Sequence, residues 1–253
     1  MSKLLTLLAM TSALTATAAD KEARVYEMRT YTASPGKMEA LHQRFRDHTV
    51  KLFAKHGIEQ IGYWVPMDAP ESKLIFVLGY ASRAAREQAW KSFLADPQWQ
   101  AAFKESEKNG SLVAKVENPF LIATDYSPAI KVGPVKNPRA FELRTYTASP
   151  GNLGHLNARF RDHTVALFAK HGMTNLAYWN LMPDQKGAAE TLVYLLAHES
   201  REAAAKSFKG FREDPAWMKA RTESEQKAGG SLTAAKNGVV SLFLKPTDYS
   251  PTK

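Results

Sequence analysis

Hydrophobic and polar residues alternate at the start of the first half of the chain. Across residues 25–32 the even-numbered positions share one face, and the opposite face carries Glu27, Arg29 and Tyr31. A period of two is typical of a β-strand with two different faces, and the β-branched and aromatic content agrees with it. The pattern therefore predicts a half-buried strand.

The periodicity then changes to that of a helix. Ser34, Pro35 and Gly36 predict the start of a helix, with Ser34 as its N-cap, and apolar side chains then recur at helical spacing up to a terminating Gly57. Residues 58–65 and 74–80 predict a hairpin. Residues 82–94 predict a second helix, and Asp96-Pro97 predicts the capped start of a third. A last strand is expected at 111–123. The order βαββαβ is that of a ferredoxin-like α+β module, in which helices cover one face of an antiparallel sheet.

The same pattern occurs again in the second half. EMRTYTASPG at Glu27 reappears as ELRTYTASPG at Glu142, and RFRDHT, LFAKHG, YW, DP and TDYSP also occur in both halves. Self-similarity at this length predicts a duplicated module. We expect a signal peptide at 1–19, a first module at 20–127, a Pro- and Gly-containing linker at 128–138 and a second module at 139–253.

One sheet face of each module is left without helices, and an apolar sheet face must be covered. The tandem copies predict an intrachain pseudo-dimer that packs sheet against sheet and closes a barrel. Separate packing in dimers of whole chains is the alternative, and further homo-oligomers are compatible with either. We expect Glu27, Arg29 and Tyr31, with their counterparts Glu142, Arg144 and Tyr146, to point into this barrel.

The first residues carry Lys3, then an apolar run over 4–14 and small residues at 16–19, which is the order of a secretory signal. This predicts a periplasmic or secreted protein. No later segment is long and apolar enough to predict a transmembrane anchor. The chain has no cysteine, which excludes disulfides and thiolate chemistry. The net charge of +9 is dispersed among acidic residues, so no nucleic-acid partner is expected.

The repeated motifs EMRTYTASPG, LFAKHG, GYW, ADPQW and TDYSP resemble the NIPSNAP family across nearly the whole mature chain, twice. The resemblance implies a dimeric α+β barrel, a fold shared with small antibiotic-biosynthesis-type monooxygenases and with several binding proteins.

The six first-strand residues are the leading candidates for chemistry. Arg29 and Arg144 can bind a carboxylate, enolate or phosphate, and Tyr31 and Tyr146 can donate a hydrogen bond or a proton. The alternative is structural: each arginine pairs with Glu27 or Glu142 and completes a buried polar layer.

Further candidates lie on later elements. His48 and His163 are expected on the apolar side of their helices, one turn after Phe45 and Phe160. Each is either a general base or a histidine that only fills space in the core. Trp64 and Trp179 either line a ligand pocket or pack in a core. Tyr80 aligns with His198, so the two halves are chemically different and both residues are candidate ligand contacts.

Dinucleotide, phosphate-loop, zinc-protease and serine-hydrolase motifs are absent from the sequence, and neither a cofactor nor a metal is expected. Two hypotheses follow. The first is a barrel that binds a small anionic or aromatic molecule, as a cofactor-independent oxygenase or isomerase. The second is a non-catalytic envelope protein that binds a partner and whose polar residues only hold the halves together.

Overall fold

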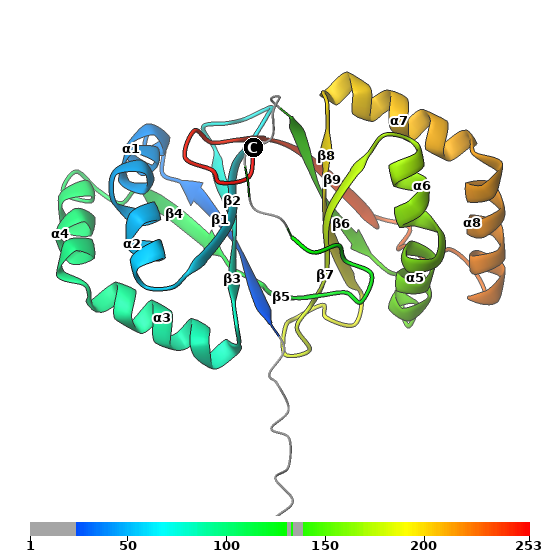
Figure 1. Cartoon of the computed structure of the whole chain (residues 1–253), viewed down its shortest axis with the longest axis horizontal. Coiled ribbons are helices and arrows are strands. Elements are labelled where there is room, and N and C mark those ends of the chain that lie inside the picture. The colour runs from blue at the N-terminus through cyan, green and yellow to red at the C-terminus, as the bar shows by residue number, and fades with distance from the viewer. Residues whose placement is uncertain (1–23, 131–132, 134–138) are drawn as a thin grey trace, which may run out of the picture.

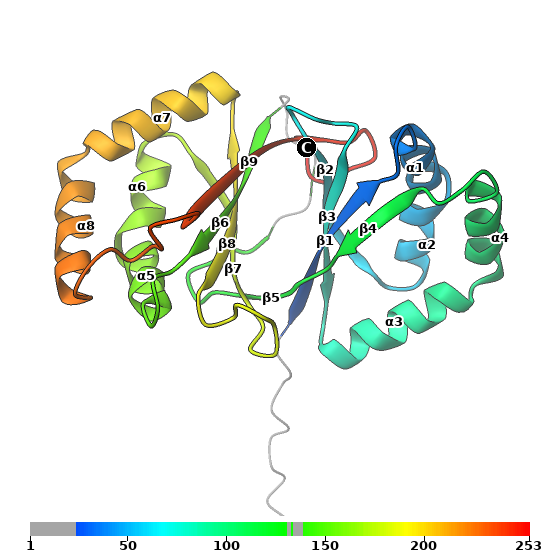
Figure 2. The same ribbon diagram turned by 180° about the vertical axis from the view of Figure 1, so that it is seen from behind.

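The computed structural model describes residues 24–130, 133 and 139–253. The expected signal peptide and most of the expected linker lie outside the described residues. Two similar modules meet through their sheets, and the helices of each module cover the outside (Figures 1 and 2). The predicted α+β architecture of two tandem modules forming one barrel is confirmed.

The first module contains five strands and three helical segments, the first of which is interrupted by a π-helical turn, η1. Its elements are β1 (Val25–Ala33), α1 (Met38–Arg44), η1 (Phe45–Thr49), α2 (Val50–Lys55), β2 (Glu59–Pro66), β3 (Lys73–Tyr80), α3 (Arg83–Ala95), α4 (Pro97–Ser106), β4 (Val113–Glu117) and β5 (Phe120–Ala123).

The second module repeats this order, with one strand in place of β4 and β5. Its elements are β6 (Ala140–Thr147), α5 (Leu153–Arg159), η2 (Phe160–Thr164), α6 (Val165–Lys170), β7 (Thr174–Leu181), β8 (Thr191–His198), α7 (Arg201–Glu213), α8 (Pro215–Lys227) and β9 (Val239–Pro246).

Helix boundaries follow local chemistry in most places. The carboxylate of Asp96 accepts a hydrogen bond of 2.9 Å from the Gln98 amide, and Pro97 takes the first position of α4, where a missing N–H costs nothing. The expected helix start at Ser34 is wrong. Residues 34–37 form a turn, in which the Lys37 amide donates to the Ser34 carbonyl at 2.9 Å, and α1 begins at Met38.

The nine strands form one sheet in the order β3-β2-β9-β6-β8-β7-β5-β1-β4, and β1 also pairs with β3. This last pairing closes eight antiparallel strands into a ring, with β4 attached outside it. The ring depends on strand exchange, because β5 of the first module pairs with β7, and β9 of the second module pairs with β2. The predicted pseudo-dimer is therefore a single closed barrel.

The barrel interior is a packed apolar core. The side chains that fill it come from both modules and include Tyr26, Ile61, Trp64, Ile75, Val77, Phe141, Trp179, Val193, Leu195 and Leu244. On β1 it is thus the even-numbered positions that point inward. The prediction that Glu27, Arg29 and Tyr31 point into the barrel is wrong, and so is the same prediction for Glu142, Arg144 and Tyr146. These six residues lie on the outer face of the sheet, beneath the helices.

The two TDYSP segments are exchanged arms, which means that each one packs against the module to which it does not belong. Asp248 of the second module receives two hydrogen bonds from Arg46 of the first, at 2.7 and 3.1 Å, while Asp125 of the first module receives two from Arg161 of the second, each 2.7 Å. Tyr249 packs into the core between the sheet and helices of the first module. Each module is therefore completed by the end of the other. Among the described residues, no helix is long and apolar enough to cross a membrane.

Candidate functional site

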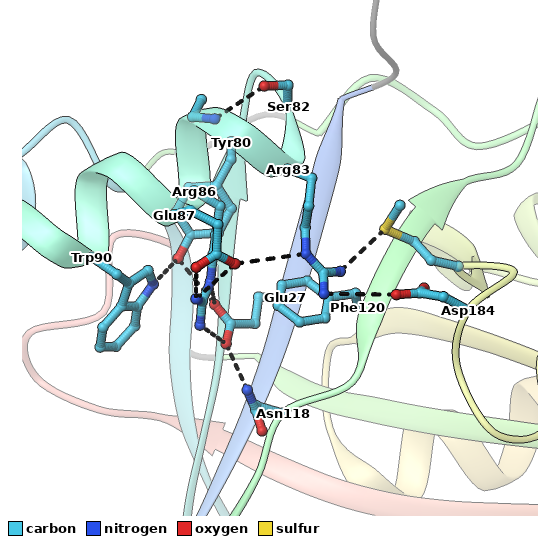
Figure 3. A network of polar contacts seen from close by, with 12 residues as sticks. Glu27, Tyr80, Ser82, Arg83, Arg86, Glu87, Trp90, Asn118, Phe120 and Asp184 are labelled. Carbon is cyan, nitrogen blue, oxygen red and sulfur yellow. Dashed lines mark hydrogen bonds and ion pairs between the residues drawn. The ribbon is translucent and has the colours of Figure 1, made fainter.

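Glu27 is the centre of a buried polar network between β1 and α3 (Figure 3). Its carboxylate is fully buried and accepts two hydrogen bonds from Arg86, at 2.9 and 3.1 Å, and one from Asn118, at 3.0 Å. Arg29 and Tyr80 also donate to it, Tyr80 at 3.2 Å. A carboxylate surrounded by this many donors has few lone pairs left for a ligand.

The same donors decide the charge of Glu27. Burial by itself favours the neutral acid, but the hydrogen bonds from Arg86 and the positive charge of Arg29 outweigh it and lower the pKa of Glu27. Glu27 is therefore ionised at neutral pH. It fixes the two guanidinium groups in place, and it is poorly suited to accept a proton.

A cavity of about 680 Å³ lies beside this network, between the outer face of the first module's sheet and its helices. Its walls combine aromatic rings with cationic groups. The aromatic residues are Tyr31, Phe45, Phe53, Trp90, Phe93, Trp99 and Phe103. The cationic residues are Arg29, Arg44, Arg86, Lys91 and Lys115. A concave site with apolar walls and a few convergent polar groups is typical of small-molecule binding.

Arg29 and Arg44 are the two cationic residues of this cavity that are themselves buried, with 8% and 5% of their surface exposed. Arg29 lies 4.4 Å from the centre of the Trp90 ring and donates to the Tyr31 hydroxyl at 3.2 Å. Arg44 donates to Glu107 at 2.7 Å. The Nε–H of each arginine has no hydrogen-bond partner among the described residues. An unpaired buried donor is costly, and a ligand oxygen would satisfy it.

A π-helical turn shapes one wall of the cavity. It spans Phe45–Thr49 and is repeated at Phe160–Thr164, over the identical sequence FRDHT. The Thr49 hydroxyl donates to the Arg44 carbonyl at 3.2 Å, which stabilises the wider turn. Turns of this kind are frequent at functional sites, and here the turn places Phe45 and Thr49 on the cavity wall.

The second module has a corresponding cavity of about 310 Å³, lined by Arg144, Tyr146 and Arg159 among others, and an adjoining one of about 400 Å³ that shares Arg144. Glu142 accepts a hydrogen bond of 2.6 Å from Arg144 and another from Ser241. Its carboxylate also lies 3.0 Å from His198 Nε2. Burial opposes the ionisation of Glu142, but these partners lower its pKa. The polar network is therefore repeated with different donors.

Tyr80 and His198 occupy equivalent places beside the two buried glutamates. Tyr80 bonds Glu27 and accepts a hydrogen bond of 2.8 Å from Trp90, whereas His198 contacts Glu142 and has a buried Nδ1 without a hydrogen-bond partner among the described residues. Both residues belong to the networks behind the arginines. Neither lines the cavity that contains Arg29 or the one that contains Arg144.

His48 and His163 do not join the candidate residues. His48 is half-buried and does not line the cavity that contains Arg29. His163 is exposed and lies outside the cavity that contains Arg144, but it lines a separate, smaller pocket beside Arg159. The π-helical turn explains the difference, because its extra residue rotates Thr49 and Thr164 inward in place of the histidines.

Trp64 and Trp179 are fully buried in the barrel core. Their position favours the packing interpretation over a ligand pocket. In contrast, Arg44, Arg159, Arg86 and Thr49 were not among the residues predicted from the sequence. The repeated RFRDHT motif contained a signal for the first two, since Arg44 and Arg159 stand next to Phe45 and Phe160 at the start of the identical hexapeptide.

Comparison with known proteins agrees with this architecture. A family model described as NIPSNAP matches residues 26–128 and 141–251. A NIPSNAP family protein of known structure from Agrobacterium tumefaciens is 30% identical over 42% of this chain and 98% of its own, with a TM-score of 0.38. No curated protein matches.

Two solved structures resemble the whole two-module chain. A protein from Lactobacillus acidophilus, titled as a candidate monooxygenase, is 11% identical over 91% of this chain and 95% of its own, with a TM-score of 0.54. An anthrone oxidase-like protein is 10% identical over 91% and 94%, with a TM-score of 0.55. At these identities the likeness concerns the fold alone.

Proposed function

We propose that this chain, which belongs to the NIPSNAP family, binds a small anionic molecule with a flat apolar part in the cavity of its first module. One observation carries the proposal. Two buried arginines, Arg29 and Arg44, lie in an aromatic-walled cavity, and each has an Nε–H without a partner among the described residues. A carboxylate or enolate would accept from these donors while its apolar part packs against the rings.

The site differs from the barrel-interior site expected from the sequence. The barrel interior is filled by side chains, so the ligand is assigned to the space between sheet and helices. The cavity of about 680 Å³ is within the usual size range for small-molecule sites.

The arrangement favours binding over proton transfer. Glu27 is buried, ionised and already bonded to several donors, and His48 lies outside the cavity. Tyr31 lines the cavity, and because its hydroxyl oxygen accepts from Arg29, its O–H can still donate a hydrogen bond to a bound ligand. Turnover as an oxygenase or isomerase would then depend on the reactivity of the ligand itself, with Arg29 and Arg44 stabilising a developing negative charge.

Isothermal titration of the full chain with 2-naphthoate, octanoate and the neutral 2-naphthamide tests this proposal. We expect the carboxylates to saturate the protein and the amide to bind at least about tenfold more weakly, because it cannot form a charge-assisted pair. Arg44→Gln should weaken carboxylate binding by about tenfold or more. Lys104→Gln, which removes an exposed positive charge from the neighbouring helix α4 without altering the cavity lining, is the matched control and should leave binding unchanged.

A second variant protects the test against misfolding of Arg44→Gln. Phe103 is 45% exposed at the cavity wall, so Phe103→Asp should fold normally and weaken carboxylate binding by charge repulsion. Equal binding of naphthoate and naphthamide would contradict the proposal, as would the absence of saturation by either carboxylate at millimolar concentration. In either case the second hypothesis, a purely structural polar layer, would be preferred.

A further inference from the structure

The two cavities differ at two positions that change their chemistry. Phe103 on α4 aligns with Arg221 on α8, and Leu94 on α3 aligns with Arg212 on α7. All four residues line the cavity of their own module. The second module has therefore replaced two apolar wall residues by guanidinium groups. Its cavity of about 310 Å³ adjoins a second one of about 400 Å³, and Arg144, Phe208 and Arg212 line both.

The buried arginine of the second cavity is less well paired than its counterpart. Arg44 donates to Glu107 at 2.7 Å and to Ser106 at 3.2 Å. Arg159 is 6% exposed, and its one ion pair among the described residues is to Glu225, at 3.5 Å. A buried guanidinium with a single distant partner lacks the compensation that burial of a charge requires. Consistently, burial lowers the pKa of Arg159 despite that partner.

Glu225 is moreover shared between two cations. Arg159 and Arg221 both approach the same oxygen, Oε1 of Glu225, at 3.5 and 3.3 Å. Four arginines line the cavity: Arg144, Arg159, Arg212 and Arg221. Glu225 at the wall and Glu142 behind Arg144 supply two negative charges, which leaves a formal excess of two positive charges, with Arg212 and Arg221 on the exposed side.

Two arginines that line this cavity have a buried donor without a partner in the part of the chain that the structure describes. The Nε–H groups of Arg144 and Arg159 have no hydrogen-bond partner among the described residues. Arg159 and Arg221 both contact one oxygen of Glu225, so their guanidinium groups lie close to each other beside that carboxylate. An oxyanion with several oxygens around one central atom fits such convergent donors better than an extended dicarboxylate does.

We propose that the second module is a binding site for a compact tetrahedral dianion, the phosphate group, distinct from the site proposed in the first module. The group would be held by Arg159 and Arg221, with Arg144 completing the donor set. The inference rests on the second cavity alone and does not depend on the function proposed for the first.

Titration calorimetry of the full chain with inorganic phosphate, glycerol 3-phosphate, succinate and nitrate, at constant ionic strength, tests this site. We expect one phosphate per chain, with succinate and nitrate at least about tenfold weaker. Tighter binding of glycerol 3-phosphate than of phosphate would identify a phosphate ester as the ligand, and the reverse order would identify the free ion. Either result supports the site.

Variants locate the binding. Arg159→Gln should weaken phosphate binding by about tenfold or more, since it removes a charge-assisted contact. Arg221→Phe restores the first module's residue at an exposed position, should fold normally, and should also weaken binding. Lys219→Gln on the same helix is the control, since Lys219 is exposed and does not line the cavity.

The site would be overturned if phosphate gives no saturable heat, if nitrate matches phosphate, or if Arg221→Phe binds phosphate like the unmodified chain. Failure of 2-naphthoate to bind, with phosphate bound as described, would remove the first proposal and leave this one standing.

Discussion

The indole ring of Trp64 lies against Gly62, so that a Cβ atom on Gly62 would lie 2.2 Å from Trp64 Cη2. The ring fills the barrel core, and Gly62 stands beside a bulge in the pairing of β2 with β3. The equivalent position of the second module is Ala177, so the two halves of the core are packed differently.

We predict that Gly62→Ala destabilises the protein by about 1–3 kcal/mol, because the added methyl group forces Trp64 out of its packed position. Urea denaturation followed by near-ultraviolet circular dichroism measures this. Gly154→Ala is the control, since nothing lies within 4 Å of a Cβ at Gly154. An unchanged midpoint for Gly62→Ala would show that the core has room to adapt.

Glu27→Gln should cost about 3–5 kcal/mol of the free energy of unfolding, because it leaves the buried Arg29 without a counter-charge and leaves Arg86 with only its exposed partner Glu87. Glu142→Gln should lower the free energy of unfolding by less, since Glu142 balances only one arginine. The second module has Ala204 at the position equivalent to Arg86. Denaturant titration of both variants compares the two networks. A larger loss for Glu142→Gln would contradict this account of charge balance.

The stability of the protein should fall in acid in a way that Glu27 controls. Its pKa is lowered in the folded protein, so its contribution is complete above the ordinary glutamate pKa of about 4.3 and is lost as the pH falls through the lower folded value. We expect the stability difference between the unmodified chain and Glu27→Gln to shrink below about pH 4. Denaturant titrations from pH 7 to pH 3 measure it. A constant difference over this range would exclude the linkage.

Tyr249→Ala should loosen the first module although Tyr249 belongs to the end of the second. Its ring packs against Phe45 at 6.1 Å and Tyr63 at 5.4 Å between ring centres, and its hydroxyl lies 2.8 Å from His42 Nδ1. We expect faster amide hydrogen exchange in residues 38–66, with little change in residues 153–181. Tyr126→Ala should give the mirror-image result. Faster exchange confined to the C-terminal residues would argue against the exchanged arms.

The sequence was sufficient to predict the element order, the duplication and the closed barrel. These follow from periodicity and from self-similarity, which are local properties of the chain. The strand exchange was not predicted, because the TDYSP repeats carry no sign of which module they contact. The pairing of Asp248 with Arg46 and of Asp125 with Arg161 depends on the relative placement of the two modules.

The candidate site was predicted in part. Period-two alternation identified Glu27, Arg29 and Tyr31 as sharing a face, and the structure confirms that they do. The pattern could not say which face, since strands of a closed barrel covered by helices are buried on both sides. Polar side chains were assigned to the interior, whereas the interior is narrow and apolar and the room lies beneath the helices. Arg44 was missed because the π-helical turn changes the helical register.

Because the two modules belong to one chain, a substitution in one module need not occur at the equivalent position of the other. In a barrel built from two identical chains, any substitution appears at both related places and must suit both. Here position 103 keeps phenylalanine while position 221 has arginine, and position 86 keeps arginine while position 204 has alanine. A duplicated gene product of this kind can evolve two unlike compartments around one shared scaffold.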